Sequence, residues 1–275
     1  MSNLVTRTIS GAIFVAVIVA SVLCHPVAFG VLFSLVAGLT AWEFYSIIES
    51  GNNHNRIFGT IGAVVLFACC FAIGFLNVSY TVLAVYALYI ICLLIAELFR
   101  KAENPIRNWA YLLLGQTMVA LPLASLNYIM FCHEDGKWLL LALFVIIWTN
   151  DTGAYCVGSL LGRHKMFPRV SPGKSWEGLV GGVIFALLAG WIFSMYVMLS
   201  DASGLNIVLW LVFALLVSSF GTLGDLTESL TKRTLGIKDS GHIIPGHGGM
   251  LDRFDSLLLA APVIAIFLML LNFIK

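Results

Sequence analysis

Residues 205–230 read LNIVLWLVFALLVSSFGTLGDLTESL, an apolar run whose end carries carboxylates. Residues 229–255, SLTKRTLGIKDSGHIIPGHGGMLDRFD, form a dense polar segment before the next apolar run. A transmembrane helix needs ~20 mainly apolar residues, so the first run is long enough to cross a bilayer. The pattern therefore predicts two membrane helices joined by this polar segment. Because the rest of the chain is so apolar, we expect the polar segment to have a function.

The whole chain has the composition of a membrane protein. Of its 275 residues, 60% are hydrophobic and 11% are charged, and the mean hydropathy is +0.98. We predict an all-α fold, a polytopic integral membrane helical bundle with about nine transmembrane helices. A single membrane domain would cover 1–275, with N-terminal helices in 1–131 and a second half in 138–275. The nine apolar runs lie at 9–24, 27–48, 57–76, 80–99, 109–131, 138–161, 176–199, 205–230 and 254–274.

The basic residues predict the orientation of this bundle. If the nine helices cross the membrane in turn, all of the 15 Lys and Arg residues except Lys137 and Lys275 lie on the same side of the membrane as the amino terminus. Cytoplasmic loops carry the excess of Lys and Arg, so we expect a cytoplasmic amino terminus and an external carboxyl terminus. Arg7 and the apolar run after it also resemble the front of a secretory signal, but the charge count favours an uncleaved first span. The polar segment then faces the cytosol, where nucleotides are available.

Several acidic residues lie within or beside the predicted spans. A charge at mid-bilayer costs roughly 2.5 to 3.5 kcal/mol, so each must face protein, water or an ion. Asp151 lies near the middle of the sixth run, and Asp225 lies in the cytosolic half of the eighth. Glu228 follows Asp225 by three residues, and Asp255 follows Asp252 by three, which puts each pair on one helix face, about 60° apart. The spacing predicts that these carboxylates point toward one site.

A cavity with such carboxylates suits one or two divalent cations. Mg²⁺ usually takes one or two carboxylates and completes its shell with phosphate oxygens and water. The cations, carboxylates and glycine amides of the polar segment together suit a metal-bound polyphosphate. Ion pairing with nearby Lys or Arg is the alternative role, equally open for Asp239 beside Lys238. Asp151 is either a site carboxylate or a polar brace, and we expect Glu43 and Glu97 to be interface or packing acids.

A second basic segment, residues 162–178 (GRHKMFPRVSPGKSWEG), lies at the same predicted face. Its Gly-Lys-Ser fragment is no P-loop, because Pro168 stands where that motif needs glycine. We predict a tight turn at Pro172 and Gly173 that opens a helix near Ser175, whose free amides attract anions. The alternative is a loop that touches lipid headgroups. In the helix itself, we expect Gly178 and Gly182 to allow close helix packing.

The polar segment resembles the signature of the phosphatidate cytidylyltransferases, also called CDP-diglyceride synthetases or CDP-diacylglycerol synthases. One departure is Thr231, where the family usually has an apolar residue. Segments 151–155 and 171–178 also look like shared motifs of this family, and the resemblance covers roughly 148–260. The first five spans match only in being hydrophobic. The matching positions of the polar segment are Ser229, Lys232, Arg233, Lys238, Asp239, Gly241, Ile244, Pro245, His247, Gly248, Gly249, Met250, Asp252, Arg253, Phe254 and Asp255.

The resemblance implies an enzyme that transfers CMP from CTP to phosphatidic acid and forms CDP-diacylglycerol and pyrophosphate. It implies one or two Mg²⁺ ions as cofactor, membrane lipid as surroundings, no nucleic-acid partner and a possible homodimer. Residues 138–275 would then be the catalytic half. We expect a multi-pass protein of the bacterial inner (plasma) membrane, with its active site facing the cytoplasm.

The resemblance also implies roles for individual residues. Asp225, Asp252 and Asp255 would bind metal, and together with Lys232 they are the expected catalytic residues. The basic residues would hold phosphates, while His247 would shape a phosphate-binding turn. The expected substrate-binding residues are Lys174, Ser175, Arg233, Lys238, His247, Arg253 and Asp151.

Two other functions remain as alternatives. A CTP-dependent kinase of a polyprenol or phytol also needs a membrane bundle, a nucleotide and Mg²⁺, but it leaves CDP and a phosphorylated alcohol. A secondary transporter would use intramembrane acids and broken helices as well. Many transporters have related halves, and the first five spans contain no counterpart of the polar segment.

Overall fold

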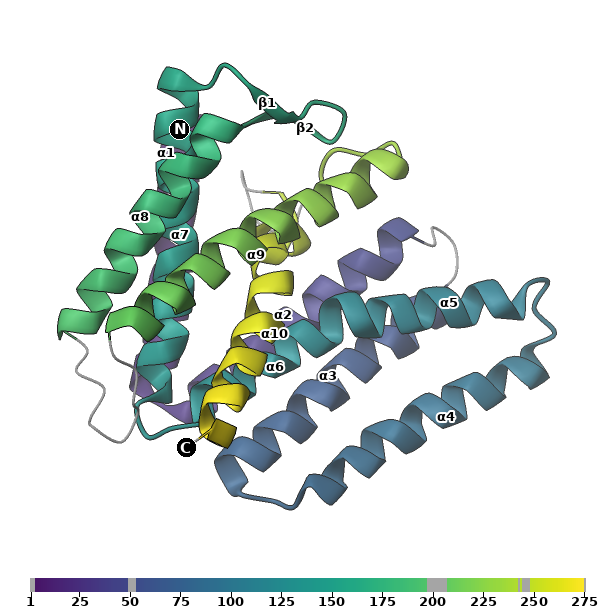
Figure 1. The fold of residues 1–275 in the computed structure, drawn as a ribbon. Coiled ribbons are helices and arrows are strands. Elements are labelled where there is room, and N and C mark those ends of the chain that lie inside the picture. Colours follow the sequence, from purple (N-terminus) through teal and green to yellow (C-terminus); the bar gives the residue numbers. More distant parts are fainter. Residues whose placement is uncertain (1–2, 49–52, 197–206, 242, 244–247, 275) are drawn as a thin grey trace. The chain divides into compact units, whose positions relative to one another are not determined.

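A computed structural model describes residues 3–48, 53–196, 207–241, 243 and 248–274 (Figure 1). In this part of the chain, eight helices are long and apolar enough to cross a membrane, and a shorter apolar helix covers Thr8–Cys24. The prediction of an all-helical, multi-pass membrane protein is therefore confirmed. In chain order the elements are α1 (Asn3–Cys24), α2 (Pro26–Ile48), α3 (Asn53–Leu76), η1 (Tyr80–Val82), α4 (Leu83–Arg100), α5 (Pro105–Gly115), η2 (Gln116–Ala120), α6 (Leu121–Phe131), α7 (Gly136–Leu161), β1 (Lys165–Phe167), β2 (Ser171–Ser175), α8 (Trp176–Tyr196), α9 (Ile207–Thr234) and α10 (Leu251–Ile274).

The chain divides into two compact units. Unit 1 contains Met1–Tyr128 and Asp239–Phe254, and unit 2 contains Ile129–Lys238 and Asp255–Lys275. The later part of the polar segment therefore packs with the first helices of the chain, although it lies far from them in sequence. A single membrane domain with a catalytic half at 138–275 stays a prediction.

Unit 1 is held by polar contacts inside its apolar core. The hydroxyl of buried Tyr45 in α2 donates to the carbonyl of Leu112 at 2.7 Å. Gln116 Nε2 donates to Tyr45 Oη at 2.9 Å and to the carbonyl of Gly59 at 2.8 Å. Buried polar groups need such partners, so these bonds fix α2 against α3 and the π-helical turn η2.

In unit 2, α7 and α8 approach closely. A Cβ on Gly178 would lie 2.9 Å from the carbonyl oxygen of Ala154, and one on Gly182 would lie 2.8 Å from Asn150 Oδ1. The predicted packing role of both glycines is confirmed. The same Asn150 oxygen accepts a hydrogen bond from Ser218 Oγ at 2.6 Å, which joins α7 to α9.

A short hairpin connects α7 to α8. Its strands β1 and β2 pair antiparallel, and the turn lies before Pro172 and Gly173, which belong to β2. The predicted turn at these two residues is therefore wrong. Val170 N–H donates to the carbonyl of Phe167 at 3.0 Å, so Pro168 occupies the second turn position, which suits its fixed φ. The start of the next helix after Ser175 is confirmed.

Candidate active site

The polar segment begins where α9 ends. Gly236 has a φ of +71°, a conformation that costs glycine little because it has no Cβ. The N–H of Ile237 donates to the carbonyl of Lys232 at 3.0 Å, and the N–H of Gly236 donates to that of Arg233 at 3.1 Å. This pair of bonds is a Schellman ending, which satisfies the last helical carbonyls. The last turns of α9 therefore form a rigid platform for acidic and basic side chains.

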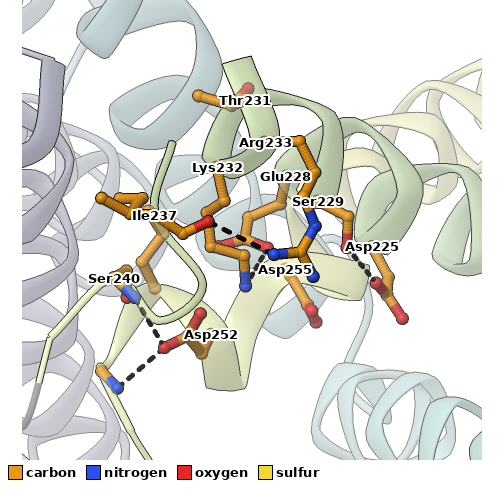
Figure 2. A network of polar contacts seen from close by, with 12 residues as sticks. Asp225, Glu228, Ser229, Thr231, Lys232, Arg233, Ile237, Ser240, Asp252 and Asp255 are labelled. Atoms are coloured by element: carbon orange, nitrogen blue, oxygen red, sulfur yellow. Dashed lines mark hydrogen bonds and ion pairs between the residues drawn. The ribbon is translucent and has the colours of Figure 1, made fainter. Parts of the chain in front are cut away.

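Unit 2 gathers four carboxylates at this platform, here called the α9 cluster: Asp151, Asp225, Glu228 and Asp255. The first three lie close enough to Asp255 for their charges to act on it. Gly224 allows this approach, because a Cβ there would lie 2.6 Å from the carbonyl oxygen of Asp255. Figure 2 shows Asp225, Glu228 and Asp255 side by side. The sequence predicted that the acidic residues point toward one site, and the four carboxylates of the α9 cluster do lie together within unit 2.

Two lysines pair with the α9 cluster. Lys174 Nζ lies 2.7 Å from Asp225 Oδ2, and Lys232 Nζ lies 2.6 Å from Glu228 Oε2. Ser229 Oγ also donates to Asp225 Oδ1 at 3.2 Å. The Lys232 and Glu228 side chains are only 12% and 5% exposed, and a buried ion needs such a partner because desolvation costs several kcal/mol. The α9 cluster therefore contains four carboxylates and is paired with two lysines.

The other basic residues of the polar segment lie differently. Arg233 donates through Nε to the carbonyl of Val170 at 3.3 Å and through Nη1 to that of Ile237 at 3.4 Å. It thereby ties the hairpin turn to the end of α9. Lys238 and Arg253 are exposed to solvent.

The hairpin positions Lys174 beside α9 and caps α8 with the next residue. Ser175 is 3% exposed, and its Oγ accepts the N–H of Gly178 at 3.1 Å, as an N-cap serine does. Glu177 accepts the N–H of His164 at 3.2 Å and lies 2.6 Å from His164 Nδ1. Ser175 thus satisfies one helix-end amide itself, and its predicted part in substrate binding stays a prediction.

An open surface pocket of about 760 Å³ lies at the base of the hairpin. Its lining combines basic side chains, one acid and two apolar side chains, and basic side chains beside apolar ones suit the phosphate and the chains of a lipid. The lining residues are Arg163, His164, Lys165, Trp176, Glu177 and Val180.

Unit 1 contains the other predicted metal ligand, Asp252, at the start of α10. Its Oδ2 accepts the N–H of Ser240 at 3.0 Å and that of Gly249 at 2.9 Å (Figure 2). Gly248 has a φ of +84°, and a Cβ there would lie 2.9 Å from the same oxygen. The glycines of the polar segment therefore wrap backbone amides around Asp252. His247 lies outside the described residues.

Sequence reasoning missed the contribution of Glu43. This residue of α2 is 4% exposed, and its Oε2 accepts the N–H of Leu251 at 2.9 Å and the hydroxyl of Ser240 at 3.1 Å. The only signal in the sequence was a lone carboxylate near the end of an apolar run, which is shared by Glu97. Glu97 instead pairs with Arg100 at 2.7 Å.

The carboxylates fit Mg²⁺ better than a metal that needs a full protein cage. Among the side chains that the structure describes, no three of His, Cys, Asp or Glu are arranged to hold a metal ion. Mg²⁺ does not need three, because it binds through one or two carboxylates and takes its other ligands from phosphate and water. Asp225 and Asp255 supply oxygens of this kind in unit 2, and Asp252 precedes Asp255 by one turn of α10.

Comparison with known proteins shows the family. Residues 5–271 match the cytidylyltransferase family, and the chain belongs to it. Curated relatives named phosphatidate cytidylyltransferase include a Staphylococcus haemolyticus protein, 38% identical over 197 residues, which covers 72% of this chain and 67% of that protein. A Staphylococcus saprophyticus protein is 44% identical over 143 residues (51% and 53%), and a Haemophilus influenzae protein is 46% identical over 132 residues (48% and 46%). The chain thus spans about half the length of these last two relatives.

Proposed function

We propose that this member of the cytidylyltransferase family transfers CMP from CTP to phosphatidic acid, forming CDP-diacylglycerol and pyrophosphate. The observation that carries the proposal is the α9 cluster, in which Lys174 and Lys232 pair with carboxylates beside Asp255. Carboxylates that can hold a cation, next to lysines that can hold phosphate, suit a nucleoside triphosphate. The printed name of the relatives supports phosphatidate as the acceptor.

The reaction requires no strong general base. An oxygen of the lipid phosphate attacks the α-phosphorus of CTP, the bond from that phosphorus to the β-phosphate bridge breaks, and pyrophosphate leaves with the electron pair. The attacking phosphate is already anionic, so the protein has to align it and neutralise charge. The basic and apolar side chains that line the hairpin pocket support a phosphorylated lipid as one of the two substrates.

We assign the metal-binding role to Asp225, Asp252 and Asp255, with one or two Mg²⁺ ions. The bound metal would offset the charge of the triphosphate and of the departing pyrophosphate. The spacing of Asp252 and Asp255 on α10 supports this assignment, as does the proximity of Asp225 to Asp255. Asp151, whose side chain accepts from Asn150 at 3.3 Å, would add negative charge to the same site.

Lys174 would then move from carboxylate to phosphate. The Lys174 and Asp225 side chains are 26% and 30% exposed, and such an ion pair is worth about 0–1 kcal/mol, so it opens at little cost. Asp225 would hold the metal ion, and Lys174 would then be able to hold a phosphate oxygen. Lys232 and the more exposed Arg233, Lys238 and Arg253 would hold the remaining phosphate charge, and His247 would shape the turn between them.

The proposal includes an orientation in the membrane. With its amino terminus in the cytoplasm of a bacterial cell, the chain exposes the polar segment to cytosolic CTP and to the inner leaflet of the plasma membrane. The distribution of Lys and Arg supports this orientation. A homodimer is proposed from the family resemblance alone.

The test is a product assay on the detergent-purified protein with CTP, phosphatidic acid and Mg²⁺. Pyrophosphate release that requires all three components, together with a nucleotide-linked lipid, is the expected result. Formation of CDP with a polyprenol or phytol acceptor would instead identify a lipid kinase. An intact protein that releases neither product would contradict an enzymatic role and direct attention to transport.

A further inference from the structure

We infer that Glu43 of α2 is a positioning residue, which seats Ser240 and Leu251 of the polar segment and thereby orients Asp252. The effect on turnover rests on the proposed function, whereas the seating itself does not. Nothing in the relatives' names or in the predicted site assigns a role to this residue.

Glu43 holds the segment at two places. Its Oε2 accepts the backbone N–H of Leu251, the first residue of α10, at 2.9 Å. The first amides of a helix have no partner within the helix and carry positive charge, so a buried carboxylate is well placed there. The same oxygen accepts the hydroxyl of Ser240 at 3.1 Å.

Ser240 connects Glu43 to Asp252. Its hydroxyl donates to Glu43, while its backbone N–H donates to Asp252 Oδ2 at 3.0 Å. Because one residue serves both carboxylates, a shift of Glu43 would move a donor that fixes the Asp252 side chain. Leu251 directly precedes Asp252, so both of the Glu43 contacts lie within one residue of Asp252 or of its donor.

The surroundings of Glu43 are closely packed. A Cβ on Gly241 would lie 2.6 Å from Glu43 Oε1, and a Cβ on Gly249 would overlap both Glu43 Oε2 and Ser240 Oγ. Phe254, 2% exposed, packs against Phe33 of α2 at a ring distance of 6.3 Å. Backbone contacts, two glycines and a buried phenylalanine therefore bring Ser240 and the start of α10 against α2 at Glu43.

Glu97 is a second buried acid of unit 1 and provides a comparison with Glu43. It is also 4% exposed, but its Oε1 accepts from Arg100 at 2.7 Å and from Asn108 at 2.5 Å. Glu43 Oε1, in contrast, is buried without a hydrogen-bond partner among the described residues. Burying an oxygen without a hydrogen-bond partner costs free energy. The position of Glu43 beside the amides around Asp252, despite this cost, supports the seating role.

The first test measures amide hydrogen exchange by mass spectrometry and does not depend on enzyme activity. In Glu43→Ala, the peptide that contains the Leu251 amide should exchange about tenfold faster, the factor expected for loss of its hydrogen bond to a charged group. The Ser240 amide, whose acceptor is Asp252, should also exchange faster because Ser240 is no longer held by Glu43. Glu97→Ala, the matched control, should leave these peptides unchanged. Glu43→Gln keeps an acceptor oxygen and should give intermediate protection. Unchanged exchange in both Glu43 variants would overturn the inference.

The second test separates positioning from general destabilisation. Loss of a group that orients a metal ligand typically costs about 10- to 100-fold in metal affinity or activity. We expect Glu43→Gln to raise the Mg²⁺ concentration for half-maximal pyrophosphate release and to lower kcat, with the KM for CTP little changed. Glu97→Gln should leave the Mg²⁺ dependence as in the wild type.

The two tests also separate this inference from the proposed function. A wild-type protein that releases no pyrophosphate would refute the proposed function, while the exchange experiment would still decide the seating role. A wild-type protein that is active, with the same Mg²⁺ dependence in Glu43→Gln, would refute the positioning of Asp252.

Discussion

Lys174 Nζ lies 2.7 Å from Asp225 Oδ2, so an ion pair joins strand β2 of the hairpin to α9. The two residues are distant in sequence, and the pair is only partly buried. An ion pair of this kind adds about 0–1 kcal/mol to stability. We therefore expect the pair to matter more for substrate binding than for folding.

Exchanging the two charges tests this conclusion. In the double variant Lys174→Asp with Asp225→Lys, the ion pair is kept, so the Tm should stay close to that of the wild type. Pyrophosphate release should fall at least about 100-fold, as it does when a charge-stabilising group is removed from an active site. Full turnover by the exchanged protein would show that the residues serve only as a structural pair.

Asp252→Asn should abolish activity while the protein still inserts and purifies normally. The substitution keeps the shape of the side chain and an acceptor for the Ser240 and Gly249 amides, but it removes the charge that would bind metal. Glu103→Gln is the control, since it changes an exposed acid outside the polar segment. Near-normal turnover by Asp252→Asn in the pyrophosphate assay would refute the metal-ligand assignment.

Lys232→Ala should raise the KM for a substrate or lower kcat far more than Lys101→Ala does. Lys232 lies in the α9 cluster, whereas Lys101 is an exposed residue at the end of α4. Steady-state kinetics on both variants provide the comparison. Equally small effects would mean that both lysines serve only membrane topology.

The Lys232 and Glu228 pair also makes a prediction about stability. Lys232→Met leaves the 5% exposed Glu228 side chain without this cation, and removal of one partner of a buried pair costs about 3–5 kcal/mol. Adding Glu228→Gln removes the remaining charge and should recover most of the loss. Thermal unfolding in detergent measures both effects, and equal Tm values for the single and double variants would contradict the prediction.

Substitutions at two glycines with positive φ distinguish the effect of backbone strain from the effect of a change at the predicted site. Gly236→Ala and Gly248→Ala should each destabilise the protein by about 1 kcal/mol or more, because alanine is strained at these dihedral angles. A Cβ meets nothing within 4 Å at Gly236, but it lies 2.9 Å from Asp252 Oδ2 at Gly248. Only Gly248→Ala should therefore also reduce pyrophosphate release, and equal activity losses in the two variants would argue against this reading.

Much of the local structure could be predicted from the sequence. Within the described residues the nine apolar runs are helical, and a helix begins after Ser175, as expected. The hairpin turn was misplaced, because Pro172 and Gly173 look like a turn while Pro168 is the residue whose turn bond to Val170 actually forms. Both sites obey local turn rules, and only the pairing of β1 with β2 selects between them.

The sequence by itself determined the class of fold, the membrane segments and the acidic and basic residues from which a site can be built, because hydrophobic length and helical spacing act over neighbouring residues. Only the tertiary structure decided which of these residues meet. Glu43 bonds to Leu251 across a separation of 208 residues, and Lys174 reaches Asp225 from another element. Such contacts depend on how whole helices pack, and no local pattern distinguishes Glu43 from the equally buried Glu97.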